Sequence, residues 1–302
     1  MTTPTQTEGY YAGLSGLEFL SDWQPLELGE GLLIQRTYGH FMQSNIMAFK
    51  LPANPGEHHA GPWKATTQHD GWDVHAELFI PSSYKPKHGA SLRDVAGTLV
   101  AMIRLKCDPN VRFLVESNYS LSAGADLGDQ MRIKPIETMP QYTRLGFVNP
   151  EDAKMASHRL VWVRDNWKHA VSLMGSHADF KTAIDTFAMS MFIPNHGTTL
   201  VALWGALEAL FSPSTSELRF RVSILLASYL HPPGEDRAKI QKEIYDLYDK
   251  RSAAAHGKPK HSFDHLVQTF NIMQVVLVRM IEENSVPTKA HLNDLLLGGV
   301  KP

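Results

Sequence analysis

The spacing of apolar residues changes near residue 179 from short runs to a helical repeat, and no other feature of this 302-residue chain constrains its fold as strongly. From there to about residue 284, apolar residues recur three and four positions apart, as in a helix with one buried face. The repeats and the turn residues between them predict five helices, at 179–192, 198–211, 216–230, 235–256 and 262–284. Their short connections favour antiparallel neighbours in a bundle.

The first 150 residues instead carry short apolar or alternating runs, separated by proline and glycine turns, which is typical of strands. These runs lie at 32–34, 45–51, 74–80, 99–105 and 111–115, and a further candidate strand is at 159–164. The stretch 92–105 also fits a helix that runs into a strand. The predicted fold class is therefore α+β. A mixed, β-rich domain over 1–175, with a sensing or substrate-positioning role, precedes an all-α bundle over 176–302.

Charge and cysteine content narrow the classes of partner. The chain has 29 Lys and Arg against 31 Asp and Glu, a net charge of −2, so a site for a polyanion has to be local. Its single cysteine, Cys107, excludes disulfide frameworks and Cys-based zinc sites. The first residues lack the pattern of a signal peptide, and the richest apolar run, 200–211, contains Glu208. We therefore expect a cytoplasmic protein with no membrane partner.

Two charged residues interrupt the apolar stripes of the predicted helices. In 198–211 the stripe is Leu200, Leu203, Trp204, Leu207 and Phe211, and Glu208 takes its i+8 position. In 235–256 the stripe is Ile240, Ile244, Leu247, Tyr248 and Ala255, and Arg251 takes its i+11 position. Both charges are therefore expected to point toward the core, where an unpaired ion costs several kcal/mol.

These inward charges have more than one explanation. The simplest is a structural ion pair of Glu208 with Arg251, or with Arg221 at the edge of the third helix's stripe. The other is that Arg251 lies at a cleft or an interface and binds an anion. The sequence alone leaves both open.

His256 follows Arg251 by five residues and is itself followed by Gly257, a signal for the end of a helix. Residues five apart point about 140° away from each other on a regular helix. The side chains of Arg251 and His256 therefore converge only if the helix end is distorted or a second chain takes part.

The segment around them is locally basic. Lys250, Arg251, Lys258 and Lys260 occur with no acidic residue between 250 and 261, and His261 adds latent charge. In a protein of net charge −2 this segment is a candidate anion site. We assign phosphate or RNA binding to Lys250, Lys258, Lys260 and His261.

Three segments of the second half resemble the HEPN superfamily, most closely its Apea-like branch. They read LVALWGALEALF at 200–211, ELRFR at 217–221 and IYDLYDKRSAAAHG at 244–257, and the similarity covers roughly 179–284. The resemblance implies a helical bundle that pairs two-fold, so that the Arg-x4-His motifs of both subunits face each other. Active members are metal-independent endoribonucleases of toxin–antitoxin, abortive-infection and CRISPR-associated systems.

The resemblance also implies roles for individual residues. Arg251 and His256 match the catalytic pair and Glu208 the acidic residue of its helix, with Arg221 and Tyr248 in support. RNA supplies the 2′-hydroxyl nucleophile, so the site needs a base, an acid and positive charge around the phosphate. In a dimer one His256 serves as base and the other as acid, while both Arg251 side chains brace the phosphate. The implied partners are RNA, a second copy of the chain and an antitoxin or trigger protein.

The sequence gives less support to a metal site, a nucleotide-binding loop or a serine hydrolase. The most crowded histidines, His58, His59, His69 and His75, lie among glycines and lack an HExxH pattern, so we read them as loop residues and expect no metal. Phosphate-binding glycine loops and a GxSxG elbow are missing, and no cofactor is expected.

One alternative to the endoribonuclease is a non-catalytic module that binds a nucleotide, RNA or a partner protein. Another is a monomer in which Arg251 only neutralises Glu208.

Overall fold

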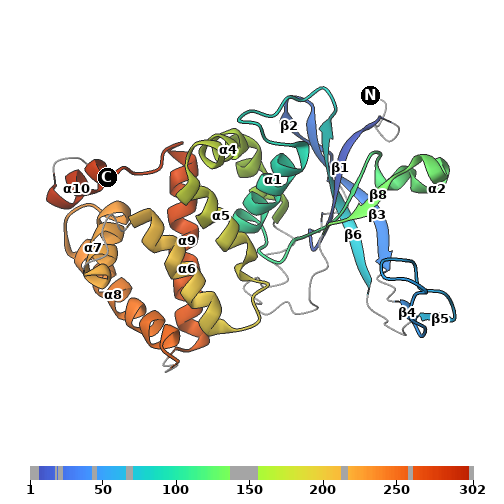
Figure 1. Cartoon of the computed structure of the whole chain (residues 1–302). Helices are drawn as coiled ribbons and strands as arrows, with labels where there is room; N and C mark the ends of the chain where they lie inside the picture. The colour runs from blue at the N-terminus through green and yellow to red at the C-terminus, as the bar shows by residue number, and fades with distance from the viewer. Residues whose placement is uncertain are drawn as a thin grey trace.

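The first half of the chain builds a sheet and the second half a run of helices (Figure 1). The computed structural model describes residues 7–17, 19, 23–42, 46–65, 71–136, 156–211, 217–257 and 261–298. The predicted α+β class is confirmed, with an antiparallel sheet region followed by helices.

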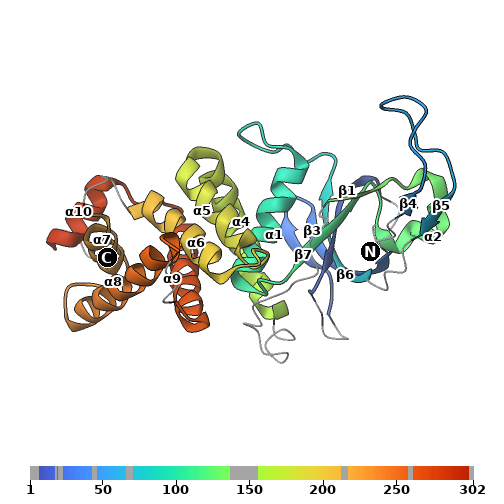
Figure 2. The same cartoon turned by 60° about the horizontal axis from the view of Figure 1, so that its bottom comes forward.

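The six strands of the main sheet are antiparallel and lie in the order β2-β3-β6-β1-β7-β8. Their bounds are β1 Gly9–Ser15, β2 Leu26–Gly29, β3 Leu32–Met42, β6 Gly71–Pro81, β7 Arg112–Ser117 and β8 Ile133–Pro135. A separate pair, β4 (Ile46–Ala48) and β5 (Trp63–Ala65), projects at the far end of the sheet (Figure 2). Short turns η1 (Leu121–Ala123), α2 (Gly124–Leu127) and η2 (Gly128–Gln130) connect β7 to β8.

The helices of the second half follow the predicted periodicity closely. They are α5 (Ala178–Ser190), α6 (His196–Phe211), α7 (Leu218–Leu230), α8 (Glu235–Ala255) and α9 (Phe263–Glu282). Each differs from its predicted range by at most two residues at either end. All five apolar residues of the α6 stripe are fully buried, so one face of α6 forms part of the core.

Two predicted strands are wrong, because both segments are helical. Residues 159–164 belong to α4 (Ala156–Ser176), whose buried Leu160, Val163, Trp167 and Ala170 recur three and four apart over a span longer than the six residues of the predicted strand. Residues 99–105 belong to α1 (Leu92–Lys106). Every residue of α1 from 98 to 105 is buried, so the polar face that would reveal a helical period is missing.

The burial of α1 follows from its place between the sheet and the other helices (Figures 1 and 2). It contacts β1, β6 and β7 on one side and α4, α5 and α9 on the other. The indole of Trp167 on α4 donates to the backbone oxygen of Leu28 on β2 at 2.9 Å. One hydrophobic cluster therefore runs from Ala12 of the sheet to Leu295 of α10 (Lys289–Leu297).

None of the helices in the described part of the chain combines the length and apolar character needed to cross a bilayer.

Candidate functional site

Helices α6 and α8 pack against each other and bring the two predicted inward charges together. Glu208 lies on the last turns of α6 and Arg251 on the last turns of α8. Arg251 Nη2 lies 3.1 Å from Glu208 Oε1 and also donates to Oε2 at 3.2 Å. Of the two partners that the sequence left open for Glu208, the structure pairs it with Arg251.

This ion pair is about four-fifths buried, since the side chain of Arg251 is 22% exposed and that of Glu208 is 19% exposed. Two charges that have lost most of their hydration stabilise the fold only if each keeps its partner. Only Nη2 of the guanidinium is bound to Glu208, and Nε is a buried donor without a partner in the described part of the chain.

Tyr248, one turn before Arg251 on α8, forms a cluster with Glu208 and Arg251. Its hydroxyl donates to Glu208 Oε1 at 2.7 Å, and its ring lies 5.4 Å from the Arg251 guanidinium carbon. Trp204 of α6 packs edge-on against the Tyr248 ring at 5.2 Å. Burial, followed by the hydrogen bond to Glu208, raises the pKa of Tyr248 to about 12. Tyr248 therefore stays a donor at neutral pH and holds the carboxylate in place for Arg251.

Arg221 does not join this cluster in the structure. It lies on α7 with a half-buried side chain, and its Nε has no hydrogen-bond partner within the described residues. Arg219, two residues earlier on α7, instead binds α8 through Asp249 and the hydroxyl of Tyr245. Arg219 was not among the predicted site residues, since an arginine on an exposed helix face carries no pattern that separates it from others.

His256 ends α8 as predicted. Its backbone N–H binds the carbonyl oxygens of Ser252 and Ala254, and Gly257 follows with a φ of 68°, the left-handed conformation that favours glycine. The imidazole is exposed. Because α8 is α-helical through Ala255, no distortion turns His256 toward Arg251 within one chain.

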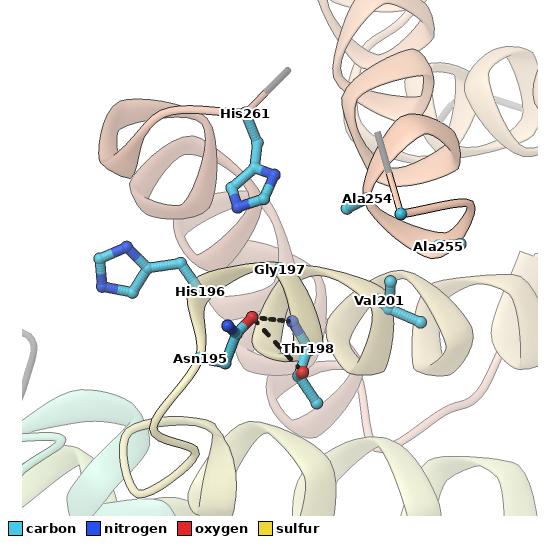
Figure 3. Close-up of a pocket in the computed structure, with 9 residues that line it drawn as sticks. Asn195, His196, Gly197, Thr198, Val201, Ala254, Ala255 and His261 are labelled. Carbon is cyan, nitrogen blue, oxygen red and sulfur yellow. Dashed lines mark hydrogen bonds between the residues drawn. The ribbon is translucent and has the colours of Figure 1, made fainter. Parts of the chain in front are cut away.

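A hollow of about 640 Å³ lies beside this helix end (Figure 3). Ala254, Ala255 and Gly257 line it on the α8 side, and the first turn of α6 lines it on the other. Ala255 lies one turn beyond Arg251, about 6 Å along the same helix face. The hollow therefore continues the seam between α6 and α8 that holds the ion pair.

Two histidines line the hollow, His196 from the start of α6 and His261 from the segment that leads into α9. Figure 3 shows His261 reaching over the first turn of α6 at Gly197. A methyl group added at Gly197 would come within 3.0 Å of the His261 ring, so glycine is what leaves room for this imidazole. His261 Nδ1 is buried and has no hydrogen-bond partner within the described residues.

Local capping explains where α6 begins. The side-chain oxygen of Asn195 accepts the backbone N–H of Thr198 at 3.0 Å, and its backbone oxygen accepts that of Thr199 at 2.9 Å. This cap places His196 on the first turn, at the edge of the hollow. The predicted helix began at 198, so His196 lay outside it and was not among the predicted site residues.

Of the other three predicted phosphate-binding residues, the structure describes one. Lys250 is half-buried on α8 next to Arg251. Lys258 and Lys260 lie outside the described residues, so their place relative to the hollow stays a prediction.

The histidines considered for a metal do not form one group. His58 and His59 are exposed in an irregular segment, His75 lies within strand β6 rather than in a loop, and His69 is outside the described residues. Across the part of the chain that the structure describes, no three His, Cys, Asp or Glu side chains gather as a metal site requires.

The single cysteine, Cys107, is buried at the end of α1. Burial raises the pKa of its thiol to about 12, so the thiol stays protonated at neutral pH.

The chain was compared with family models, curated proteins and solved structures, and none of the three comparisons finds a match.

Proposed function

We propose that the helical half is a metal-independent endoribonuclease of HEPN type that acts as a homodimer. The observation that carries the proposal is the cluster of Glu208, Tyr248 and Arg251, beside a helix end that presents His256 next to a histidine-lined hollow. Arg251, His256 and Glu208 stand at the positions that the resemblance assigns to the nuclease, and Tyr248 is the predicted supporting residue beside them.

The chemistry needs only what these residues supply. A histidine takes the proton of the RNA 2′-hydroxyl, the resulting oxygen attacks the adjacent phosphorus, and a second histidine protonates the leaving 5′-oxygen. Arg251 places positive charge against the phosphate oxygens, and Glu208 and Tyr248 fix its guanidinium. The products are a 2′,3′-cyclic phosphate and a 5′-hydroxyl. DNA lacks the 2′-hydroxyl and is not a substrate.

The regular end of α8 is the argument for a dimer. Arg251 and His256 point about 140° apart on a regular helix, so one copy does not aim both at the same phosphate. A second copy, related by a two-fold axis near the end of α8, brings its own His256 to the first copy's site. From the resemblance, we further propose a cytoplasmic toxin or antiviral effector that an antitoxin or trigger protein controls.

A second candidate function rests on the ion pair itself. Arg251 Nη2 contacts both carboxylate oxygens of Glu208. The same geometry therefore suits an ion pair with a structural role, in a non-catalytic module that binds RNA, a nucleotide or a partner protein. The two candidates differ in whether removal of His256 abolishes a reaction.

The test is cleavage of a structured RNA by purified protein, with and without EDTA. We expect EDTA-resistant cleavage with 2′,3′-cyclic phosphate ends, a rate about 10²- to 10⁴-fold lower for His256→Ala, and a dimer by light scattering. His231→Ala is the matched control, since His231 also ends a helix of this half, α7. Equal cleavage by His256→Ala overturns the catalytic proposal. A folded dimer that binds RNA without cleaving it supports the non-catalytic module.

A further inference from the structure

The hollow beside the end of α8 has a lining without acidic side chains. Nine described residues line it, and none of these nine is Asp or Glu. Their only titratable side chains are the imidazoles of His196 and His261, each of which can donate a hydrogen bond and carries a positive charge when protonated. The described lining therefore suits an anion better than a cation.

Ring packing orients the two imidazoles at the wall of the hollow. The His196 ring lies 5.5 Å from the ring of Phe263, on the first turn of α9. His261 lies above Gly197 of α6, in space that a larger residue would fill (Figure 3). Two histidines from different helices are thus brought to one hollow, although the chain separates them by 65 residues.

The first turn of α6 adds hydrogen-bond donors to the same wall. The side-chain oxygen of Asn195 accepts the backbone N–H of Thr198 at 3.0 Å, so its amide nitrogen is the group that remains for a ligand. The first N–H groups of a helix have no partner within it, and the helix dipole places partial positive charge there. Gly197 carries no side chain that would cover this end of the 16-residue helix.

The opposite wall, from α8, is neutral in its side chains. Ala254, Ala255 and Gly257 line it and have no polar side-chain atom. The end of α8 also brings carbonyl oxygens, but that of Ala254 already accepts the backbone N–H of Gly257 at 3.3 Å. Arg251 lies one turn before Ala255, about 6 Å along the helix. An anion in the hollow is therefore a neighbour of one at Arg251.

We propose that this hollow binds the backbone phosphate of RNA that is next to the cleaved one, so that the substrate is held at two successive phosphates. This inference rests on the proposed function, which places the cleaved phosphate at Arg251. Asn195, His196 and His261 donate hydrogen bonds to the oxygens of the second phosphate, and the start of α6 adds its partial positive charge.

An RNA that cannot react tests the site without cleavage. The probe is a short fluorescent 2′-O-methyl RNA without terminal phosphates, and its binding to the full chain is measured by fluorescence anisotropy. We expect His196→Ala/His261→Ala to raise the Kd at least tenfold. His177→Ala/His291→Ala is the matched control, because these histidines also lie at helix starts, of α5 and α10, and do not line the hollow. A Kd of His196→Ala/His261→Ala equal to that of the wild type overturns the proposal.

Gly197→Ala changes the hollow and keeps both histidines. The added methyl group comes within 3.0 Å of the His261 ring and 3.2 Å of Asn195 Oδ1, so one of these side chains has to move. We expect the Kd to rise at least threefold, although alanine favours the helix more than glycine does. Gly205→Ala, whose methyl group meets no atom within 4 Å, should not change it. An unchanged Kd of Gly197→Ala overturns the placement of the phosphate above the first turn of α6.

A chimeric substrate identifies the phosphate. In a 2′-O-methyl oligonucleotide with one ribonucleotide, only the phosphate after that ribonucleotide can be cleaved, because only there is a 2′-hydroxyl available. A neutral methylphosphonate then replaces one flanking phosphate at a time. At one of the two neighbouring positions we expect the wild-type rate to fall at least threefold, and the rate of His196→Ala/His261→Ala to stay unchanged, because this variant has already lost the contact.

The outcomes separate this inference from the proposed function. Equal effects of the methylphosphonates on the wild type and on His196→Ala/His261→Ala overturn the inference and leave the nuclease in place. If the wild type does not cleave the unmodified chimera, the proposed nuclease fails, and the binding of 2′-O-methyl RNA still decides whether the hollow holds a phosphate.

Discussion

Tyr248 donates its phenolic hydrogen to the same Glu208 carboxylate that binds Arg251, over an Oη to Oε1 distance of 2.7 Å. One carboxylate thus serves a neutral donor and a cation that lie one turn apart on α8. Tyr248 and Arg251 both bind Glu208, and the Tyr248 ring also lies 5.4 Å from the Arg251 guanidinium carbon, so the arrangement can be tested by removing one member at a time.

Tyr248→Phe keeps the ring against Trp204 and removes only the hydroxyl. We expect the free energy of unfolding to fall by about 1–2 kcal/mol, because a mostly buried carboxylate loses a hydrogen bond. Urea denaturation measures the change. Tyr38→Phe is the control, since Tyr38 is 63% exposed and its hydroxyl lies 3.4 Å from Asp73, and it should stay within about 0.5 kcal/mol of the wild type. Equal effects of the two variants would contradict the role of Tyr248.

The Glu208 and Arg251 pair should show a measurable coupling. In a double-mutant cycle with Glu208→Gln and Arg251→Met, we expect an interaction free energy of about 0.5–2 kcal/mol, because most of the hydration of both groups is lost. The exposed pair of Lys181 and Asp185, in the same cycle with Lys181→Met and Asp185→Asn, should give about 0.5 kcal/mol or less. A smaller coupling at Glu208 than at Asp185 would show that burial does not strengthen the pair.

Glu77 gives the stability a pH dependence of known sign. It is fully buried on β6, accepts hydrogen bonds from Gln35, Ser120 and the backbone N–H of Leu121, and has its pKa raised by burial. A raised pKa means that the folded state holds the proton more tightly. The stability that this proton provides is full below the unfolded pKa of about 4.3 and is lost as the pH rises through the folded pKa.

Comparison with Glu77→Gln isolates this contribution from other carboxyl groups, some of which have lowered pKa values. The unfolding free energy of the wild type minus that of Glu77→Gln should decrease as the pH rises from 4 toward neutrality. Urea denaturation at a series of pH values gives this difference. A constant or an increasing difference would contradict the raised pKa.

Gly257 sets the direction in which the chain leaves α8 after His256. Gly257→Ala places a side chain at a φ of 68° and should lower the free energy of unfolding by about 1 kcal/mol. Gly205→Ala, within α6 and exposed, should instead raise it by about 0.5–1 kcal/mol. Thermal or urea unfolding of the two variants checks the opposite signs. If both variants lost stability, the cause would be the added methyl group and not the left-handed backbone conformation of Gly257.

His261 offers a graded test of the hollow. If the hollow receives a phosphate of the RNA, His261→Ala should lower the cleavage rate about tenfold, the loss expected for one phosphate contact of about 1.4 kcal/mol, and less than His256→Ala does. The measurement is the single-turnover rate on the same RNA. His177→Ala, at an exposed histidine at the start of α5, is the control. Unchanged cleavage by His261→Ala would exclude the hollow from the substrate path.

The five helices from α5 to α9 could be predicted because apolar residues recur along them at a helical period, whereas α10 was not predicted. Leu200, Leu203 and Leu207 recur with that period, and Glu208 and Arg251 stood out as exceptions to it. Their pairing was one of two alternatives, and only the packing of α6 on α8 decides it. The direction of a charged side chain follows from periodicity, whereas the choice of partner follows from how two helices meet.

The sheet half was less predictable for a related reason. The sheet and helices α4 and α5 bury every residue of α1 from 98 to 105, so this part of the helix shows no exposed face and reads as a strand. Strand β1 was missed because Gly9 and Gly13 interrupt its apolar run. His196 was missed because its importance depends on His261, which is 65 residues away in the sequence and lies opposite it only in the fold.

The position of α1 between the sheet and the helices has a consequence for how such a chain can arise. Gene fusion joins domains that each fold on their own. Here one helix, α1, packs against the sheet on one side and against the other helices on the opposite side. Recombination on either side of α1 would leave one product with a bare apolar surface. The sheet and the helices are therefore expected to be inherited together, and distant relatives should carry both or neither.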